Sequence, residues 1–298
     1  MISYLKTFLL ALISAPFAAL PVSHGAHFAF LSDVLHFAGP EQSDRRGFYY
    51  AVISVTFSLV AFVALRKLYF AALSAPFLPE RDAAARSAKR ARLRRLLHLS
   101  LSVLPALVLV IPVQLPLKNV SYLVDVFVSL LGPDYLLVTA FCCAANGLFL
   151  FISFWYAARR TVPAVQAART PGVLRFAVYQ VPAHFLPGLS HVGLGATNLL
   201  LTDVAQTGIV REALFYYTPA LFLVNVVRIV RYLVGGLVVD PRMAAVAVGG
   251  ALLGCIPVVA LLSRINLKKT FIFFALYSIV FGGAIAVYAF WDVLRTMI

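Results

Sequence analysis

Four of the six histidines lie in two short polar segments, which we call the first tip (residues 20–27) and the second tip (residues 184–193). The first tip reads L-P-V-S-H-G-A-H and the second reads H-F-L-P-G-L-S-H-V-G. Imidazole rings can hold a phosphate as cations, transfer protons or bind a divalent metal such as Zn²⁺. Hydroxyls can act as nucleophiles or cap helices. The structural alternative is that neutral rings bond the tip backbone. The candidates are Ser23, His24, His27, Ser190 and His191.

The composition shows which solvent surrounds these tips. Of the 298 residues, 62% are hydrophobic and 12% are charged, and the mean hydropathy is +0.93. Soluble domains are about 45–50% apolar and about 25% charged, so a soluble enzyme is excluded. The net charge of +14 does not indicate nucleic-acid binding, because Lys and Arg stand at the ends of apolar runs and do not alternate with aromatics.

Six apolar segments approach or exceed the roughly 20 residues that a helix needs to cross a bilayer. Regions 7–38 and 173–205 each hold two short apolar pieces separated by a tip. This pattern predicts a re-entrant hairpin, since non-helical backbone at membrane depth requires a protein or wet surrounding. The six predicted spans are residues 48–65, 97–117, 134–157, 212–233, 243–263 and 270–291.

The order of these segments divides one membrane domain, residues 1–298, into two repeats. Residues 1–160 contain a hairpin and three spans, and residues 173–298 contain the same series. An odd number of spans per repeat inverts the second repeat relative to the first. We therefore expect an all-α integral membrane protein with six transmembrane helices and two re-entrant helical hairpins in an inverted repeat, whose tips meet near the midplane.

Basic residues predict the orientation in a plasma (inner) membrane. Nine Lys and Arg residues fall between Arg66 and Arg95, and further basic residues lie near Arg159, Arg175 and Lys268. Cytoplasmic loops carry such an excess, so we expect loop 66–95 in the cytoplasm and both termini outside. Contact with anionic lipid headgroups is the alternative interpretation of residues 81–95.

Charged residues outside the tips give few further candidates. Arg228 and Arg231 lie three residues apart on one helical face and could add positive charge at the second tip, or could extend to the interface. None of the eleven acidic residues falls on a tip. Asp33, on the outgoing arm of the first hairpin, is the nearest candidate for a base or metal ligand.

The order and spacing of these features resemble the undecaprenyl-diphosphatases over nearly the whole chain. These integral membrane enzymes are linked to bacitracin resistance and recycle the polyprenyl carrier lipid of cell-wall synthesis. Members have a first motif like E-G-L-T-E-F-L-P-V-S-S-T-G-H and a second like P-G-x-S-R-S-G. In this chain, residues 14–27 read S-A-P-F-A-A-L-P-V-S-H-G-A-H at the place of the first motif. Residues 187–193 read P-G-L-S-H-V-G at the place of the second. Pro219 matches a later proline, and residues 264–267 and 274–277 resemble the family's last span.

This sequence departs from the family at its charged positions. The two family glutamates, thought to serve acid-base and metal-binding roles, fall on Ser14 and Ala18, and the phosphate-binding arginine falls on His191. Cleavage of a phosphoanhydride requires neutralised phosphoryl oxygens and a positioned nucleophile, so the usual family mechanism is in question. The matching residues are Pro21, Ser23, His27, Pro187, Gly188, Ser190 and Gly193.

The resemblance implies a protein that binds a polyprenyl phosphate or diphosphate between the tips, with the lipid tail in a groove between spans. Hydrolysis would place His27, Ser23 and His24 in catalytic roles, with a divalent cation left open. The alternative is a catalytically inactive lipid-phosphate translocator or binding protein on the same fold. A homodimer is also left open. The expected phosphate-binding residues are Ser190, His191, Gly188, Gly193, Arg228 and Arg231.

Overall fold

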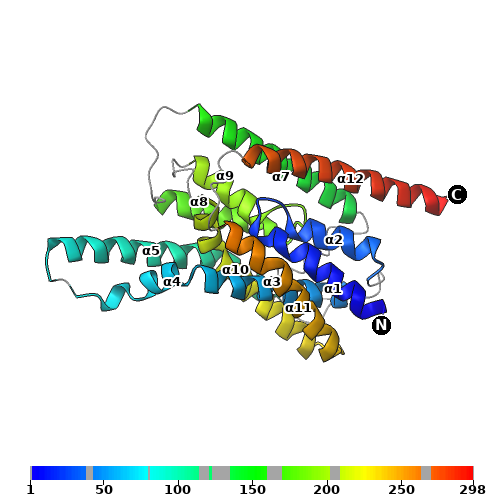
Figure 1. The fold of residues 1–298 in the computed structure, drawn as a ribbon, viewed down its shortest axis with the longest axis horizontal. Coiled ribbons are helices and arrows are strands. Elements are labelled where there is room, and N and C mark those ends of the chain that lie inside the picture. The colour runs from blue at the N-terminus through cyan, green and yellow to red at the C-terminus, as the bar shows by residue number, and fades with distance from the viewer. Residues whose placement is uncertain are drawn as a thin grey trace.

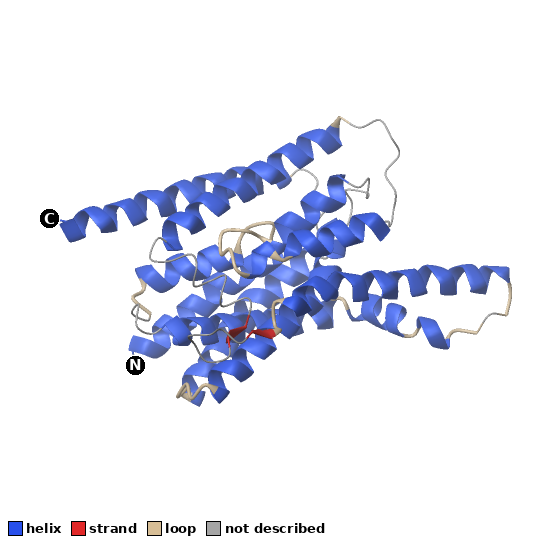
Figure 2. Ribbon diagram, turned by 180° about the vertical axis from the view of Figure 1, so that it is seen from behind, coloured by secondary structure: helices blue, strands red, loops and turns tan. Residues whose placement is uncertain are grey.

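The computed structural model describes residues 2–37, 43–79, 81–113, 121–122, 135–159, 170–201, 209–262 and 270–297. The described chain is almost entirely helical (Figure 2). Two-residue strands β1 (Pro112–Val113) and β2 (Ser121–Tyr122) pair antiparallel. Five helices have the length and apolar composition to cross a membrane. The chain is therefore a multi-pass helical membrane protein.

The five long apolar helices cover five of the six predicted spans. All combine at least 21 residues with high hydropathy, so a continuous helix satisfies their backbone groups inside lipid. Residues 134 and 263, at the edges of two predictions, lie outside the described residues. The helices are α3 (Ser43–Ala64), α7 (Tyr135–Ala158), α10 (Ile209–Val234), α11 (Pro241–Leu262) and α12 (Phe271–Met297).

The predicted span 97–117 is wrong in its bounds. Residues 97–108 form the last part of α5 (Ala83–Val108), a 26-residue helix whose first half is strongly basic. The helix ends shortly before Pro112, because a proline disfavours helical backbone at the residue before it. Residues 114–117 lie outside the described part of the chain. Consequently α5 is not among the five helices of membrane-spanning composition.

Both predicted hairpins contain two helices that flank a tip. In the first hairpin, α1 (Ile2–Ser14) and the 3₁₀ helix η1 (Ala15–Ala19) precede the first tip, and α2 (His24–Val34) begins within it. In the second, α8 (Thr170–Gln180) and η4 (Pro182–His184) precede α9 (His191–Leu201). Pro16 and Pro182 each stand in the first turn of a 3₁₀ helix, where a missing N–H costs no bond.

The long helices run side by side, and two parts extend from the bundle (Figure 1). Helices α4 (Arg66–Leu73) and α5 project beyond it at one end, joined through η3 (Ala75–Phe77). Helices α7 and α12 form a closely packed pair along one side. Gly147 and Gly282 permit this approach, since a side chain at either would meet the partner's backbone.

Helix α10 contains Pro219, which cannot donate a hydrogen bond to the carbonyl of Phe215. The Tyr69 hydroxyl donates to that carbonyl at 2.9 Å instead. Ser102 of α5 donates to the next carbonyl, that of Tyr216, also at 2.9 Å. Side chains of α4 and α5 therefore satisfy the backbone that the proline disrupts and connect α10 to these two helices.

Candidate functional site

The two tips meet through reciprocal hydrogen bonds of their serines. Ser23 caps α2 by accepting from the Ala26 N–H at 3.1 Å, and its hydroxyl donates to the carbonyl of Pro187 in the second tip. Ser190 accepts from the Gly193 N–H at 2.9 Å, and its hydroxyl donates to the Leu20 carbonyl of the first tip at 3.3 Å. Each serine thus caps its own helix and binds the opposite tip.

Asn146, in the middle of α7, connects both tips to α12. Its side-chain oxygen accepts from the Ser190 N–H at 3.2 Å. Its amide nitrogen donates to the Pro21 carbonyl at 3.2 Å and lies 3.4 Å from the Ser278 hydroxyl. Asn146 is 1% exposed. Because every one of these groups is buried, the amide fixes the relative position of the tips.

The glycines of the second tip allow its close packing. A side chain at Gly188 would overlap the Cys142 side chain and the Thr139 carbonyl of α7. A side chain at Gly193 would lie 2.7 Å from the Asn146 side-chain oxygen. Both glycines therefore serve contacts with α7 in this structure, and their predicted phosphate contact stays a prediction.

A small cavity lies between the tips, which we call the tip cavity. It leaves only about 10 Å³ to the centre of a water molecule, which is close to the space that one water needs. Its described lining contains no carboxylate, guanidinium or ammonium group. The lining residues are Phe17, Ala18, Val22, His24, Gly25, Tyr50, Ala183, Leu189, Ser190, His191, Tyr217 and Leu221.

His24 lies in the wall of the tip cavity. Its Nδ1 is 2.9 Å from the carbonyl oxygen of Ser14, at the end of α1. A carbonyl can only accept, so Nδ1 carries the proton. Nε2 then accepts from the Ser54 hydroxyl of α3 over a long distance of 3.4 Å. The ring also stacks on Tyr50, with 5.0 Å between centroids.

His27 has both ring nitrogens engaged and does not line the tip cavity. Nδ1 donates to the Ser23 carbonyl at 2.6 Å, and Nε2 accepts from the Tyr277 hydroxyl at 2.7 Å. The ring stacks between Phe17 and Phe281, at centroid distances of 3.4 and 4.2 Å. His27 therefore connects the first hairpin to α12. Its predicted catalytic role requires Tyr277 to release Nε2.

His191 lines the tip cavity from the first residue of α9. Its Nδ1 is 2.8 Å from the side-chain oxygen of Gln180, and the Gln180 nitrogen donates to the His191 carbonyl at 2.7 Å. Its ring is stacked parallel to the ring of Tyr217. The centroids of the His191 and His184 rings are 4.4 Å apart. Within the described chain, Nε2 of His191 and Nε2 of His184 are buried without a hydrogen-bond partner.

Arg228 lies beside the second tip and is buried, so it does not extend to the interface. Its Nη2 donates to the His184 carbonyl at 3.0 Å, and Nη1 is 3.5 Å from the Asn225 side-chain oxygen. No carboxylate of the described residues pairs with it. Arg231 is half-buried, and its guanidinium lies 5.3 Å from the centroid of the Tyr232 ring. Arg228 is thus the nearer positive charge.

Asp33 does not reach the tip cavity. Its carboxylate pairs with Arg46 of α3 at 3.8 Å, and about a quarter of each side chain is exposed. Across the described ranges, no three His, Cys, Asp or Glu side chains stand close enough together to hold a metal ion. The described residues therefore do not offer the ligand set of the divalent metal that the family resemblance implies.

Three residues of this site were not predicted as site residues, namely the buried Asn146 and Gln180 and the half-buried Tyr277. Asn146 stands alone in an apolar span, and an isolated polar residue at membrane depth indicates function by default. Gln180 precedes the second tip and Tyr277 follows an apolar run. Neither carries a spacing signal, because their partners are more than ten residues away.

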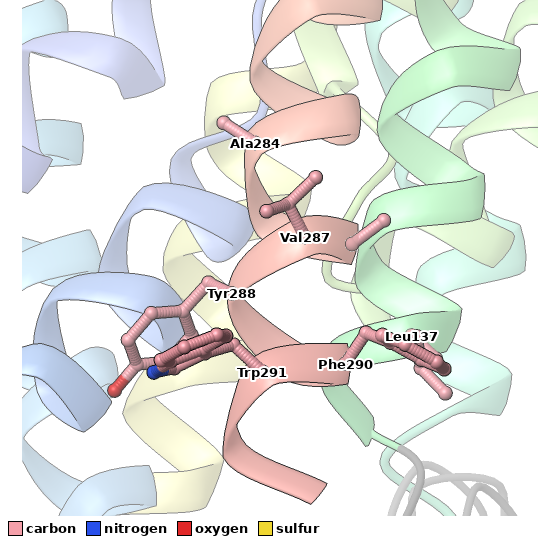
Figure 3. Close-up of a pocket in the computed structure, with 7 residues that line it drawn as sticks. Leu137, Ala284, Val287, Tyr288, Phe290 and Trp291 are labelled. Atoms are coloured by element: carbon pink, nitrogen blue, oxygen red, sulfur yellow. The ribbon is translucent and has the colours of Figure 1, made fainter. Parts of the chain in front are cut away.

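A second hollow, of about 680 Å³, is lined by Leu137 of α7 and by residues of α12. Figure 3 shows Phe290 near Leu137 and Tyr288 near Trp291, on opposite sides of α12. Its lining is almost entirely hydrocarbon. The hollow lacks the polar groups that phosphate chemistry requires, so the tip cavity is the candidate site.

Comparison with known proteins identifies the family of this chain. No curated protein matches the chain. Residues 7–284 match the profile of a family described as bacitracin resistance protein BacA. The match includes both tips and nearly all of the membrane-spanning helices. Because it extends over far more than half of the sequence, the chain belongs to the bacitracin resistance protein BacA family, that of the undecaprenyl-diphosphatases.

Proposed function

We propose that the protein binds the headgroup of a polyprenyl diphosphate, undecaprenyl diphosphate in the first place, at the tip cavity and hydrolyses it to the monophosphate. One observation carries the proposal: in a chain of the BacA family, the two tips meet around a cavity that His24, Ser190 and His191 help to line. Cell-envelope lipid recycling is the corresponding process, and the lipid tail would lie in a groove between spans.

The proposed roles follow from position. Ser23, His24 and Ser190 offer polar atoms at or beside the tip cavity, where a phosphate would meet them first. Arg228 supplies a buried positive charge behind the second tip, and such a charge is worth most in a low-dielectric site. Arg231, Gly188 and Gly193 support this region from further away. His27 holds the first hairpin against α12 and would act chemically only after release by Tyr277.

Headgroup binding requires the tip cavity to widen, because its present space is close to that of one water molecule. The two serine hydrogen bonds between the tips are the contacts that a phosphate oxygen could replace. Each accepting carbonyl would then lose a bond while the hydroxyl gained a stronger one to an anion. We propose that the substrate separates the tips in this way.

For the whole molecule we propose six transmembrane segments and two re-entrant hairpins. Five of the segments are the long apolar helices, and α5 contributes the sixth, whose apolar part is shorter. Residues 1–160 and 173–298 would form inverted repeats in a plasma membrane, with the basic loop 66–95 in the cytoplasm. The reciprocal serine contacts support this, since repeats related by a two-fold axis produce paired, equivalent bonds.

A second function, binding or moving the lipid phosphate without hydrolysis, is favoured by one observation. The described lining of the tip cavity holds no carboxylate, guanidinium or ammonium group, although phosphoryl transfer depends on such charges. The inverted repeat suits alternating access. A homodimer is compatible with either function.

The deciding experiment measures phosphate release from undecaprenyl diphosphate by the purified protein, with and without EDTA. Hydrolysis predicts release that is lost in an Arg228→Gln variant. Binding alone predicts no release, while the lipid still raises the temperature of unfolding. A protein that neither releases phosphate nor gains stability from the lipid would contradict both functions.

Two further variants determine the role of His27. If His27 is the nucleophile or acid, His27→Ala abolishes release, whereas Tyr277→Phe, which frees Nε2, retains it. If His27 only connects the hairpin to α12, both variants lower the free energy of unfolding, by about 1 kcal/mol or more, and change the rate to a similar extent.

A further inference from the structure

The hydrogen bonds of Gln180 determine which nitrogen of His191 carries the proton. The His191 carbonyl can only accept, so the Gln180 atom 2.7 Å from it must be the amide nitrogen. The Gln180 oxygen therefore faces Nδ1 of His191, 2.8 Å away. An amide oxygen also only accepts, so Nδ1 must donate. The neutral imidazole then carries its lone pair on Nε2.

His191 differs from His24 and His27 in what its Nε2 meets, and it shares with His184 an Nε2 that has no partner within the described chain. All three rings direct Nδ1 at a carbonyl oxygen, that of Ser14, Ser23 or Gln180. Tyr277 occupies Nε2 of His27, and Ser54 lies 3.4 Å from Nε2 of His24. Within the described chain, Nε2 of His191 has no partner, although it is buried and its ring lines the tip cavity.

We infer that Gln180 is a positioning residue that holds His191 as the Nδ1–H tautomer, so that Nε2 serves the tip cavity as a hydrogen-bond and proton acceptor. The inference rests on the proposed function and deepens it. A fixed cation at this position would hold a phosphate, whereas a neutral ring with a free lone pair accepts a proton from water or from a protonated phosphate oxygen. The amide of Gln180 is 2% exposed, which keeps this pairing free of competition from water.

In hydrolysis, Nε2 would take a proton from a water molecule as the water oxygen bonds to the terminal phosphorus. The bridging P–O bond breaks, and its electron pair leaves with the polyprenyl phosphate. The imidazolium then returns its proton to solvent or product. The groups around His191 are Gln180 of α8, His184 of η4, His24 of α2, and Tyr217 and Arg228 of α10. None of these is a carboxylate that could take the proton in its place.

The test reads the tautomer directly, by ¹⁵N NMR of histidine-labelled protein in bilayers. A His191→Asn variant assigns the His191 signals. We expect a protonated Nδ1 and an unprotonated Nε2 in the wild type and in Gln180→Glu, which keeps the acceptor. In Gln180→Met, which removes both bonds at similar size, the proton moves to Nε2. Thr56→Val is the control: its buried hydroxyl donates to the Val52 carbonyl within α3, and its loss should leave the His191 signals unchanged.

The rate supplies the second readout. Gln180→Met should lower kcat for phosphate release roughly 100-fold with little change in KM, since general base catalysis contributes about 10²–10⁴-fold. A wild-type His191 protonated at Nε2, or a Gln180→Met variant with unchanged tautomer, would overturn the inference. Absence of release from the wild type would overturn the proposed hydrolysis instead, and the tautomer would still decide the role of Gln180.

Discussion

Asn146 is the residue on which the candidate site most depends. One amide bonds the backbone of both tips and approaches a hydroxyl of α12, so three segments distant in sequence meet at one side chain. A hydrophobic residue of the same size would fill the space but leave the Ser190 N–H and the Pro21 carbonyl without partners. Buried polar groups without partners are costly, so shape alone cannot replace this amide.

We therefore expect Asn146→Leu to lower the free energy of unfolding by about 2–4 kcal/mol, from two unsatisfied groups at about 1–3 kcal/mol each with partial relaxation. Thermal unfolding in detergent measures the change. Ser153→Ala on the same helix removes a hydroxyl bonded only to the preceding turn and should cost under about 1 kcal/mol. Equal effects of the two variants would show that Asn146 does not connect the tips.

For single residues, the sequence predicted which side chains lie close together but not which hydrogen-bond partners they have. Ser23, His24, Ser190 and His191 meet as expected, because the tips were recognisable as polar interruptions of apolar sequence. The partners Gln180 and Tyr277 could not be predicted. The role of each depends on how its helix rotates about its axis, which spacing within one sequence does not fix.

Among the helices, glycine determines how closely the second hairpin approaches α7. Gly188→Ala would bring a methyl group into the Cys142 side chain and the Thr139 backbone. Overpacking of this kind costs about 1–3 kcal/mol, and backbone cannot move aside as a side chain can. We expect lower thermal stability and loss of lipid binding together, because the displaced tip carries Ser190 and His191.

The matched control is Gly283→Ala on α12, where an added side chain meets nothing within 4 Å. Alanine is a better helix former than glycine by about 0.5–1 kcal/mol, so this variant should be neutral or slightly stabilising. Both variants are compared by thermal unfolding and by lipid-induced stabilisation. If Gly188→Ala behaved like Gly283→Ala, the close contact with α7 would not be important for the site.

The turn between α10 and α11 is tied to α1 by a partly buried hydrogen bond. The Tyr4 hydroxyl donates to the Asp240 carboxylate at 2.6 Å. This bond, followed by that from the Arg242 N–H, holds the pKa of Asp240 below its ordinary value of 3.8. A carboxyl whose pKa is lowered by folding stabilises the protein above its unfolded pKa, and that stabilisation is lost as the pH falls through the folded pKa.

The difference in Tm between the wild type and Tyr4→Phe should consequently stay constant from about pH 8 to pH 5 and shrink below about pH 4, near the unfolded pKa. The measurement is a pH series of thermal unfolding in one detergent. Asp240→Asn supplies the control, since an amide can accept the same bond without titrating. A difference that grew on acidification would mean that the bond does not act through the carboxylate.

The elements themselves were mostly predictable, because length and hydropathy decide where a helix can lie in lipid. Five predicted spans coincide with long apolar helices, and both hairpins have two helices around a tip. The segment 97–117 was not predictable from hydropathy alone. There the helix begins 14 residues earlier, in the basic sequence that Asp82 caps, and ends before Pro112.

For the whole molecule, the arrangement of the helices constrains the proposed orientation. The arm made by α4 and α5 projects from one end of the bundle, and the turn after α10 lies away from it, towards the other end (Figure 1). The arm contains most of the nine basic residues between Arg66 and Arg95. Moving such charge across a bilayer is unfavourable, so the end that bears the arm should remain in the cytoplasm.

We expect a membrane-impermeant maleimide to label Val238→Cys from the outside of intact cells and Ser87→Cys only after lysis. Val238 follows α10 and is 85% exposed, and Ser87 is exposed on α5. The native Cys142, Cys143 and Cys255 are buried, and the unmodified protein gives the background signal. Labelling with the two sides exchanged would reverse the proposed orientation.

Labelling of both positions from the same side would contradict the idea that α10 crosses the membrane between the second hairpin and this turn. Because α10 also carries Arg228, that outcome would remove the buried positive charge from the depth at which the tips meet, and the proposed headgroup site with it.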